Sequence, residues 1–245
     1  MEAAEYELMH ALEERMWWYR GLHRLLARTL AAEGGGRGRV LDAGCGTGGL
    51  LAHLAAQQAM PDRFGIDYAE GGARLARDKS GAAVAVASVN ALPFADATFS
   101  AIFSIDVLCH RDVDEAGALA EMRRCLADDG VLIANLPAFE WMKSAHDARV
   151  HNARRYTAAG ARALLFRAGF AGIRTFYWNS LLFPLMVLRR KLGTDAAAGS
   201  DVFAYPAPIE AAFRSVLAVE RALIGLGVRF PAGGSVMAVA RRRNG

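Results

Sequence analysis

The chain has 245 residues, of which 53% are hydrophobic and 22% charged, so it is long enough to bury a sizeable core in one domain. The acidic start MEAAEYELMHALEER lacks the pattern of a cleavable signal peptide, and no apolar run approaches the ~20 residues that span a bilayer. Its three cysteines, Cys45, Cys109 and Cys125, lack metal-ligand spacing, so we expect free thiols, no metal site and a cytoplasmic location.

Positive charge is spread unevenly over the chain. The formal net charge is +4, and residues 143–191 carry ten Lys and Arg side chains but a single acid, Asp147. Such an excess attracts anions, although the dominance of arginine over lysine also fits codon bias in a GC-rich genome. The segment has neither the aromatic and basic repeats of a single-strand binder nor a known nucleic-acid motif. We therefore expect a small-molecule substrate and no nucleic acid.

Helices and strands alternate along most of the chain. Apolar spacings of three and four predict a helix over residues 5–31, which the glycines at 34–36 end. Apolar runs predict strands at 39–43, 63–67, 82–88, 98–108, 130–137, 172–178 and 235–241. Helices are expected between them at 48–58, 69–79, 112–127 and 157–170. The alternation predicts an α/β fold, namely a Rossmann-like, doubly wound and mostly parallel sheet of seven strands with helices on both faces.

A long segment separates the last two predicted strands. Two helical patterns, 181–192 and 208–226, flank a linker at 193–208 that is rich in Gly, Ala, Ser and Pro. The first pattern is apolar and ends in Arg-Arg-Lys, which fits core packing or peripheral contact with anionic lipid, without stable membrane insertion. We predict a single domain over 1–245, made of a helical cap (1–36), a cofactor-binding core (37–180), a helical lid insertion (181–232) and the last strand (233–245).

The stretch VLDAGCGTGG at residues 40–49 carries the strongest signal for a ligand. Gly44, Gly46 and Gly49 form a GxGxxG pattern, which allows a tight turn and close approach of a ligand to the backbone. An NAD-dependent oxidoreductase is therefore one interpretation. Asp42 disfavours it, because a carboxylate two residues before the first glycine repels a pyrophosphate and favours a cationic ligand.

With DAGCGTG, the sequence resembles the class I S-adenosylmethionine-dependent methyltransferases, in particular a type 11-like bacterial subgroup of small-molecule and glycan pathways. The resemblance covers roughly residues 38–180 and includes RFGIDYAE, ALPFADATFSAIFSIDVLCH and EMRRCLADDGVLIANLP. The WW-aromatic-Arg start, the HD…RRY segment and the final GGSVMAVARR strand are similar to that subgroup as well.

The resemblance implies S-adenosylmethionine as cofactor, S-adenosylhomocysteine as product, and a set of binding residues. The methionine end would lie against Asp42, Gly44, Cys45 and Gly46. Asp67, about 20 residues beyond the glycines, is placed to accept the ribose hydroxyls, and Tyr68 would cover the adenine. Ser88 stands where the family often has an acid that reads the adenine amino group, and Val89 follows it. Ile105, followed by Asp106, would lie beside the sulfonium.

Three clusters are candidates for the acceptor side. Trp18, Tyr19 and Arg20 cap the cofactor or bind an apolar acceptor, with Trp18 assigned to the substrate; plain helix packing is the alternative. His110, just past the fourth strand, is a candidate base, or else a helix cap or cofactor contact.

The third cluster is HDARVHNARRY at residues 146–156. We expect His146 or His151 to act as a base oriented by Asp147, while Arg154, Arg155 and Tyr156 hold an anionic group of the substrate. A salt-bridged surface loop or a metal site are the alternatives, and the arginines disfavour a cation.

The sequence predicts an S-adenosylmethionine-dependent methyltransferase, a cytoplasmic bacterial monomer or homodimer. Its acceptor is expected to be a small molecule, anionic or drawn from a glycan, lipid or secondary-metabolite pathway. DNA is disfavoured because IDVLCH stands where amino-methylating DNA enzymes carry an N/D-P-P-aromatic loop. The alternatives are an NAD-dependent oxidoreductase and a non-catalytic nucleoside-binding module.

Overall fold

A computed structural model describes residues 2–34, 38–57, 62–191 and 202–243 of the chain. Two of the glycines expected to end the first helix, Gly35 and Gly36, and most of the predicted linker at 193–208 lie outside these described residues.

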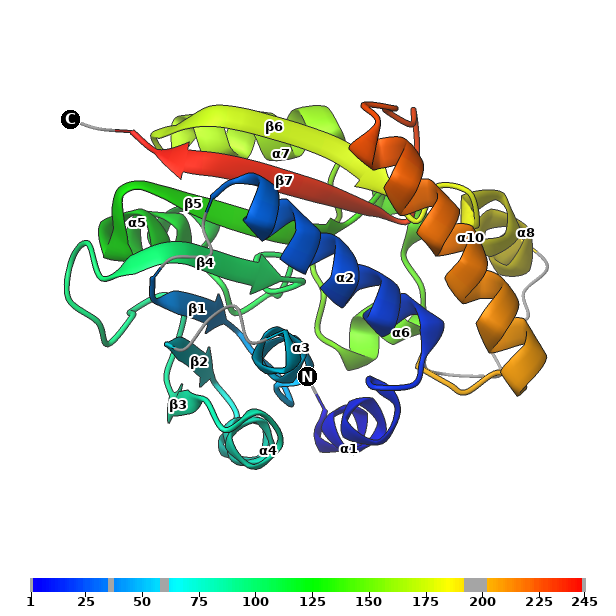
Figure 1. Cartoon of the computed structure of the whole chain (residues 1–245), viewed down its shortest axis with the longest axis horizontal. Coiled ribbons are helices and arrows are strands. Elements are labelled where there is room, and N and C mark those ends of the chain that lie inside the picture. The colour runs from blue at the N-terminus through cyan, green and yellow to red at the C-terminus, as the bar shows by residue number, and fades with distance from the viewer. Residues whose placement is uncertain (1, 35–37, 58–61, 192–201, 244–245) are drawn as a thin grey trace.

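The centre of the molecule is one seven-stranded sheet with the strand order β3-β2-β1-β4-β5-β7-β6 (Figure 1). Its strands are β1 (Val40–Ala43), β2 (Arg63–Asp67), β3 (Ala83–Val86), β4 (Phe99–Ile105), β5 (Leu126–Pro137), β6 (Phe170–Trp178) and β7 (Ser235–Arg242). All neighbouring pairs are parallel except those that β7 forms with β5 and β6. The predicted mostly parallel α/β fold is confirmed. The order reverses between β1 and β4, which opens a crevice at the carboxyl ends of these strands.

The helix predicted over 5–31 is wrong as a single element, because the chain breaks into α1 (Ala3–Leu12) and α2 (Trp17–Ala32). The break places Glu13 against the loop after β1, where Thr47 donates a hydrogen bond to it and Lys79 forms an ion pair with it. Both Glu13 and Lys79 are almost fully buried. These polar contacts keep α1 over the glycine loop while α2 continues across the sheet.

The remaining helices lie close to their predicted positions. They are α3 (Gly49–Ala56), α4 (Glu70–Ser80), α5 (Glu115–Cys125), α7 (Ala158–Arg167), α8 (Phe183–Lys191) and α10 (Ala207–Gly225). The Asp114 side chain caps α5 by accepting from the Ala116 N–H, and Thr157 caps α7 in the same way through Gly160. Two short elements were not predicted, the 3₁₀ turn Glu140–Met142 and α6 (Ala145–Arg149).

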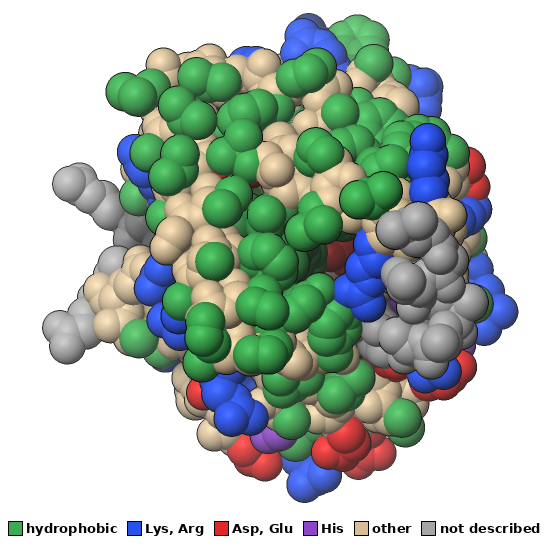
Figure 2. Space-filling view, turned by 90° about the vertical axis from the view of Figure 1, so that its right-hand side faces the viewer, with side chains coloured by type: hydrophobic (Ala, Val, Ile, Leu, Met, Phe, Trp, Pro, Cys, Tyr) green, Lys and Arg blue, Asp and Glu red, His purple; other side chains and the backbone are tan. Residues whose placement is uncertain are grey.

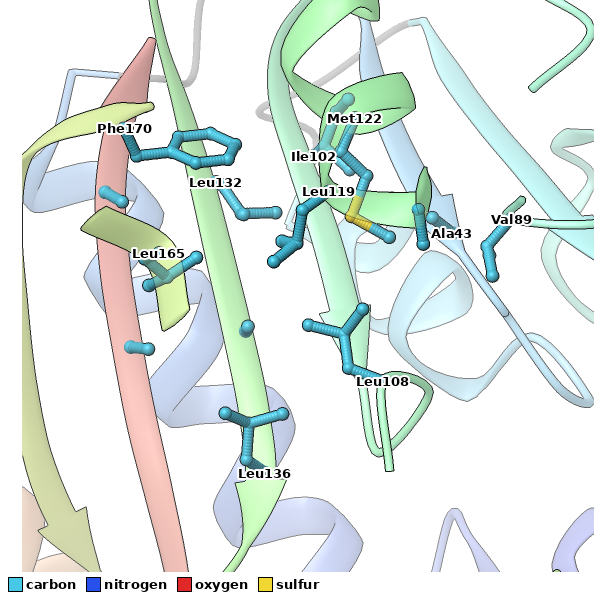
Figure 3. Close-up of a cluster of buried hydrophobic side chains, with 14 of the residues drawn as sticks. Ala43, Val89, Ile102, Leu108, Leu119, Met122, Leu132, Leu136, Leu165 and Phe170 are labelled. Atoms are coloured by element: carbon cyan, nitrogen blue, oxygen red, sulfur yellow. The ribbon is translucent and has the colours of Figure 1, made fainter. Parts of the chain in front are cut away.

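Helices cover both faces of the sheet and bury two apolar layers. On one face α5 and α7 pack on β4, β5 and β7, and Figure 3 shows Leu119, Met122, Leu132, Leu165 and Phe170 converging there. On the other face α2, α3 and α10 cover the sheet (Figure 1). Burial of both faces explains why the central strands read as continuous apolar runs rather than as alternating ones.

Steric crowding requires glycine at two positions of the loop between β1 and α3. Gly44 has φ +95°, and a Cβ there would lie 2.3 Å from Cγ2 of Val107. Gly48 has φ +84°, and its Cβ would lie 2.7 Å from the Cα of Ala76 on α4. A side chain at Gly44 would therefore push the loop away from the segment after β4, and one at Gly48 would push it away from α4.

The helices between β6 and β7 are fastened to the rest of the molecule by buried carboxylates. Glu210 of α10 accepts a hydrogen bond of 2.7 Å from the backbone N–H of Trp17. Glu220 accepts from the backbone N–H groups of Ser180 and Leu181 at 2.8 and 2.9 Å. Within the described residues, no helix is sufficiently long and apolar to traverse a bilayer. A lid function for this segment, and the division of the chain into cap, core and lid, stay predictions.

Candidate functional site

A cavity of about 860 Å³ opens at the carboxyl ends of β1, β2 and β4. It continues between α1, α2 and α8, and it lies within the size range of small-molecule sites. This is the crevice that the reversal of strand order creates, so the fold explains its position.

Asp67, at the end of β2, is the most densely bonded carboxylate of the cavity floor. Oδ2 accepts from the Gly46 N–H at 2.8 Å, and Oδ1 accepts from the Ala69 N–H at 2.9 Å and the Tyr6 hydroxyl at 2.8 Å. Burial raises the pKa of Asp67, and these three donors oppose that rise. The hydroxyl of Tyr6 thus bonds the carboxylate that the sequence assigns to ribose hydroxyls.

Asp42, within β1, is buried without the same compensation. Only 2% of the residue is exposed, and no described residue donates a hydrogen bond to its Oδ1. Burial raises the pKa of Asp42 to about 8, and the nearby carboxylates of Asp67 and Glu13 add to the rise. Because an unsatisfied buried carboxyl group is costly, the site favours a ligand that brings a positive charge or a donor.

Asp106, directly after β4, is held by side chains from two further strands. The Asn135 Nδ2 donates to Oδ1 of Asp106 at 3.0 Å, and the Trp178 Nε1 donates to Oδ1 of Asn135 at 2.6 Å. Burial raises the pKa of Asp106 to about 7, while the bond from Asn135 lowers it. Sequence reasoning missed Asn135 and Trp178, because they meet only in the folded sheet.

Glu13 and Tyr6 were missed in the same way. Both come from the N-terminal helical segment, which is predicted from the sequence only as a cap. Glu13 bonds Thr47 in the glycine loop, and Tyr6 bonds Asp67 at the end of β2. The one available signal was the acidic character of MEAAEYELMHALEER.

All three histidines that the sequence offers as candidate bases line the cavity, namely His110, His146 and His151. Burial lowers the pKa of His110 to about 4, so its imidazole is neutral near pH 7. Burial also lowers the pKa of His151, and positive charge nearby contributes. All three stay candidates for the predicted base.

Asp147 does not line the cavity. Its carboxylate accepts two hydrogen bonds from the Arg155 guanidinium, at 3.0 and 2.9 Å, and others from Ser144 and Asn152. Both charged side chains of the Asp147–Arg155 pair are almost fully buried. The pair fastens the segment that the sequence assigns to a substrate.

The other predicted substrate residues of this segment fasten the loop after β4. Arg154 donates to the carbonyl oxygens of Leu108, His110 and Val113 at 2.9–3.1 Å. Tyr156 donates to the carbonyl oxygen of Leu108 and bonds Glu115. Neither Arg154 nor Tyr156 lines the cavity, whereas Arg155 does. The described part of the chain contains no group of three or more His, Cys, Asp or Glu side chains that could hold a metal ion.

The structure brings most of the predicted cofactor residues to the cavity wall. These are Tyr19, Asp42, Gly44, Cys45, Gly46, Asp67, Tyr68, Ser88, Val89 and Ile105. Arg20 is not among the lining residues, and Trp18 lines the cavity with its ring centroid 5.7 Å from that of Trp178.

The outer part of the cavity is mostly apolar. Its lining includes Trp17, Leu182, Leu185, Met186 and Phe203. Arg189 of α8 lies at this side, with its guanidinium 4.5 Å from the Phe203 ring and donating to the Tyr205 hydroxyl at 2.9 Å. In Figure 2 hydrophobic side chains gather over the middle of this face, around a recess.

The strand order and a glycine loop above an acid-lined crevice define a Rossmann-like enzyme. Comparison with known proteins identifies the class of enzyme. Residues 41–134 match a family model described as a methyltransferase domain. A malonyl-[acyl-carrier protein] O-methyltransferase of Geobacter sulfurreducens is 34% identical over 190 residues, which cover 71% of this chain and 68% of the relative. The chain belongs to the class I S-adenosylmethionine-dependent methyltransferases and is an enzyme of that family.

Solved structures show the same fold at low identity. A SAM-dependent methyltransferase of Thermotoga maritima has a TM-score of 0.60 and 19% identity, with 98% of this chain and 96% of that chain covered. A phosphoethanolamine N-methyltransferase of Haemonchus contortus in complex with S-adenosyl-L-methionine has a TM-score of 0.55 and 16% identity, with 84% and 49% covered. The interpretations as an NAD-dependent oxidoreductase and as a non-catalytic module are overturned by the family membership.

Proposed function

We propose that the cavity binds S-adenosylmethionine along its acidic floor and transfers the methyl group to a small molecule with an apolar body. When bound, this cofactor supplies a methyl group that the positive sulfur already activates. The observation that carries the proposal is the unsatisfied buried carboxyl group of Asp42 beside the glycine loop, which matches a positively charged ligand better than a phosphate bridge.

The residues present fit the two ends of such a ligand. Asp67 offers a carboxylate that already bonds one hydroxyl group, and Tyr68, 83% exposed at the rim, has a free aromatic face for an adenine. Asp42 and Asp106 place two buried carboxyl groups along the floor, and a positively charged ligand beside them would favour their ionised form. The protein's contribution to the reaction is then to align the acceptor and exclude water, which the apolar outer part of the cavity supports.

A second candidate for the acceptor atom is a carboxylate oxygen. The relative from Geobacter sulfurreducens, 34% identical, is named for O-methylation of malonyl-[acyl-carrier protein]. Of the arginines at the cavity wall, Arg155 is the one that acts on Asp106, and its guanidinium is already bonded to Asp147. We therefore place carboxylate methylation second.

We further propose that the enzyme works in a reducing, cytoplasmic compartment. Cys45, Cys109 and Cys125 are all buried and unpaired, and burial raises the pKa of each thiol. Buried thiols that stay protonated need no oxidising environment.

Calorimetric titration with S-adenosylhomocysteine tests the proposed site. The Asp67→Ala variant is expected to bind it ~1–3 kcal/mol more weakly, the scale of losing hydrogen bonds to a charged group. Asp78→Asn, which removes an exposed carboxylate on the neighbouring α4, is the matched control and should bind like the unaltered protein. Equal affinity of the Asp67→Ala variant, or binding of NADH in place of S-adenosylhomocysteine, would refute the proposal.

A further inference from the structure

Three strands cooperate to hold one carboxylate at the cavity wall. Asp106 follows β4, Asn135 lies in β5, and Trp178 ends β6. An indole N–H can only donate, so the 2.6 Å bond from Trp178 fixes the Asn135 amide with its oxygen toward the indole. The amide nitrogen is thereby turned to Oδ1 of Asp106, at 3.0 Å.

The backbone of Asp106 is held in the same arrangement. Its N–H donates to the carbonyl oxygen of Asn135 at 2.9 Å, and its φ is +52°, a left-handed conformation that few residues other than glycine adopt. Such a backbone conformation persists only where the surroundings enforce it. Asn135 is fully buried and Trp178 is 2% exposed, so the surroundings are rigid core.

The second carboxylate oxygen of Asp106 stays open to a ligand. Asp106 lines the cavity, and none of the residues that the structure describes donates a hydrogen bond to its Oδ2. The charged and titratable groups that act on it are Arg155, Asp147, Tyr19 and Cys109. Arg155 is shared with Asp147, so the pKa of Asp106 stays near 7, where a carboxyl group exchanges protons readily.

We infer that Oδ2 of Asp106 receives the hydrogen bond and then the proton of the methyl acceptor, which is therefore a protic group, an amine or a hydroxyl. The inference rests on the proposed function. In the transfer, the acceptor N or O forms the bond to the methyl carbon, the carbon–sulfur bond breaks with its electron pair going to sulfur, and the acceptor's proton goes to Asp106. Asn135 and Trp178 are positioning residues in this account.

The same geometry disfavours a carboxylate as acceptor. A second negative charge beside Asp106 would be repelled in a site where burial already penalises negative charge. The charge-assisted bond that an ammonium or hydroxyl donates to a carboxylate is favourable at the same position. Asp106 therefore selects among acceptors as well as accepting a proton.

Sinefungin tests the inference without a known substrate. It is an analogue of S-adenosylmethionine that carries an amino group where the cofactor carries the transferred methyl. Calorimetry should show that the unaltered protein prefers sinefungin over S-adenosylhomocysteine by about tenfold or more, the scale of a hydrogen bond between charged groups. Asp106→Asn should lose this preference while its affinity for S-adenosylhomocysteine is kept, and Asp78→Asn should keep both.

The outcomes separate the inference from the function on which it rests. If the unaltered protein binds neither compound, the proposed function fails. If it binds S-adenosylhomocysteine and Asp106→Asn leaves the preference for sinefungin unchanged, the inference on Asp106 fails alone.

Two further measurements address the acceptor and the positioning residues. The complex with S-adenosylhomocysteine should bind decylamine at least about tenfold more tightly than decanoate, and Asp106→Asn should remove that difference. Equal affinities, or tighter binding of decanoate, overturn the inference.

In Trp178→Phe the Asn135 amide is no longer fixed, so the bond that lowers the pKa of Asp106 weakens. The preference for sinefungin needs an ionised Asp106, so it is lost as the pH falls through the pKa of this group. In Trp178→Phe the pH at which half of the preference is lost should therefore be higher. An unmoved midpoint contradicts the positioning role of Trp178 and Asn135.

Discussion

Buried ionisable side chains in the cavity bind protons differently in the folded and unfolded chain. Burial raises the pKa of Asp42 to about 8 and that of Asp106 to about 7, far above ordinary carboxyl values. The folded protein therefore binds more protons than the unfolded chain up to those pH values, and its stability falls as the pH rises. His23 and His110 act in the opposite sense, because burial lowers their pKa to about 3 and about 4.

The opposing contributions of acids and histidines offset each other between about pH 4 and pH 6.5, that is, between the lowered pKa of the buried histidines and the ordinary pKa of an unfolded one. Above that range the histidines no longer offset the contribution of the two aspartates. We expect the free energy of unfolding to fall by about 1–3 kcal/mol between pH 6.5 and pH 8.5. Urea unfolding at the two pH values measures it, and Asp42→Asn should flatten the decline. A decline of the same size in that variant would show that Asp42 is ionised without penalty.

At the scale of elements, α1 lies directly on the glycine loop. The ideal Cβ of Gly46 would lie 2.7 Å from Cε of Met9, and the hydroxyl of Tyr6 bonds Asp67. A carboxylate has about four lone-pair positions, and three donors already reach Asp67. Two ribose hydroxyls therefore cannot both bond this carboxylate until Tyr6 gives up its place.

This competition predicts the behaviour of Tyr6→Phe. Removal of the hydroxyl leaves the ring of Tyr6 beside Gly72 and frees one acceptor position on Asp67. S-Adenosylhomocysteine should bind several-fold more tightly, in line with about 0.5–1.5 kcal/mol for one hydrogen bond. Titration calorimetry measures the change, with Tyr177→Phe as control, which removes a hydroxyl that accepts from the backbone N–H of Ala158, the first residue of α7. Weaker binding by Tyr6→Phe would mean that the hydroxyl helps to hold the ligand instead.

At the scale of the whole molecule, the fold follows from local patterns. Seven apolar runs separated by helical patterns are visible in the sequence, and an acid near the end of the second run marks Asp67. Asp106 is visible only through the family resemblance. Its partners Asn135 and Trp178 are 29 and 72 residues away along the chain, and only the strand order brings them together.

The segment HDARVHNARRY shows why the acceptor side was harder to predict. A dense run of charged side chains looks the same in sequence whether it binds a ligand or ties down a loop. Arg154 bonds backbone carbonyl groups, which every residue has, so its partners leave no trace in the sequence. The break at Glu13 was hidden for a related reason, because its partners Thr47 and Lys79 lie in other elements.

A crystal structure of the protein with S-adenosylhomocysteine tests the central claim most directly. The account predicts ribose hydroxyls on Asp67 with the Tyr6 hydroxyl displaced, the amino-acid end beside Asp42, and the thioether sulfur facing Asp106. A ligand seated away from these three carboxylates, or one whose ribose leaves Asp67 untouched, would contradict it.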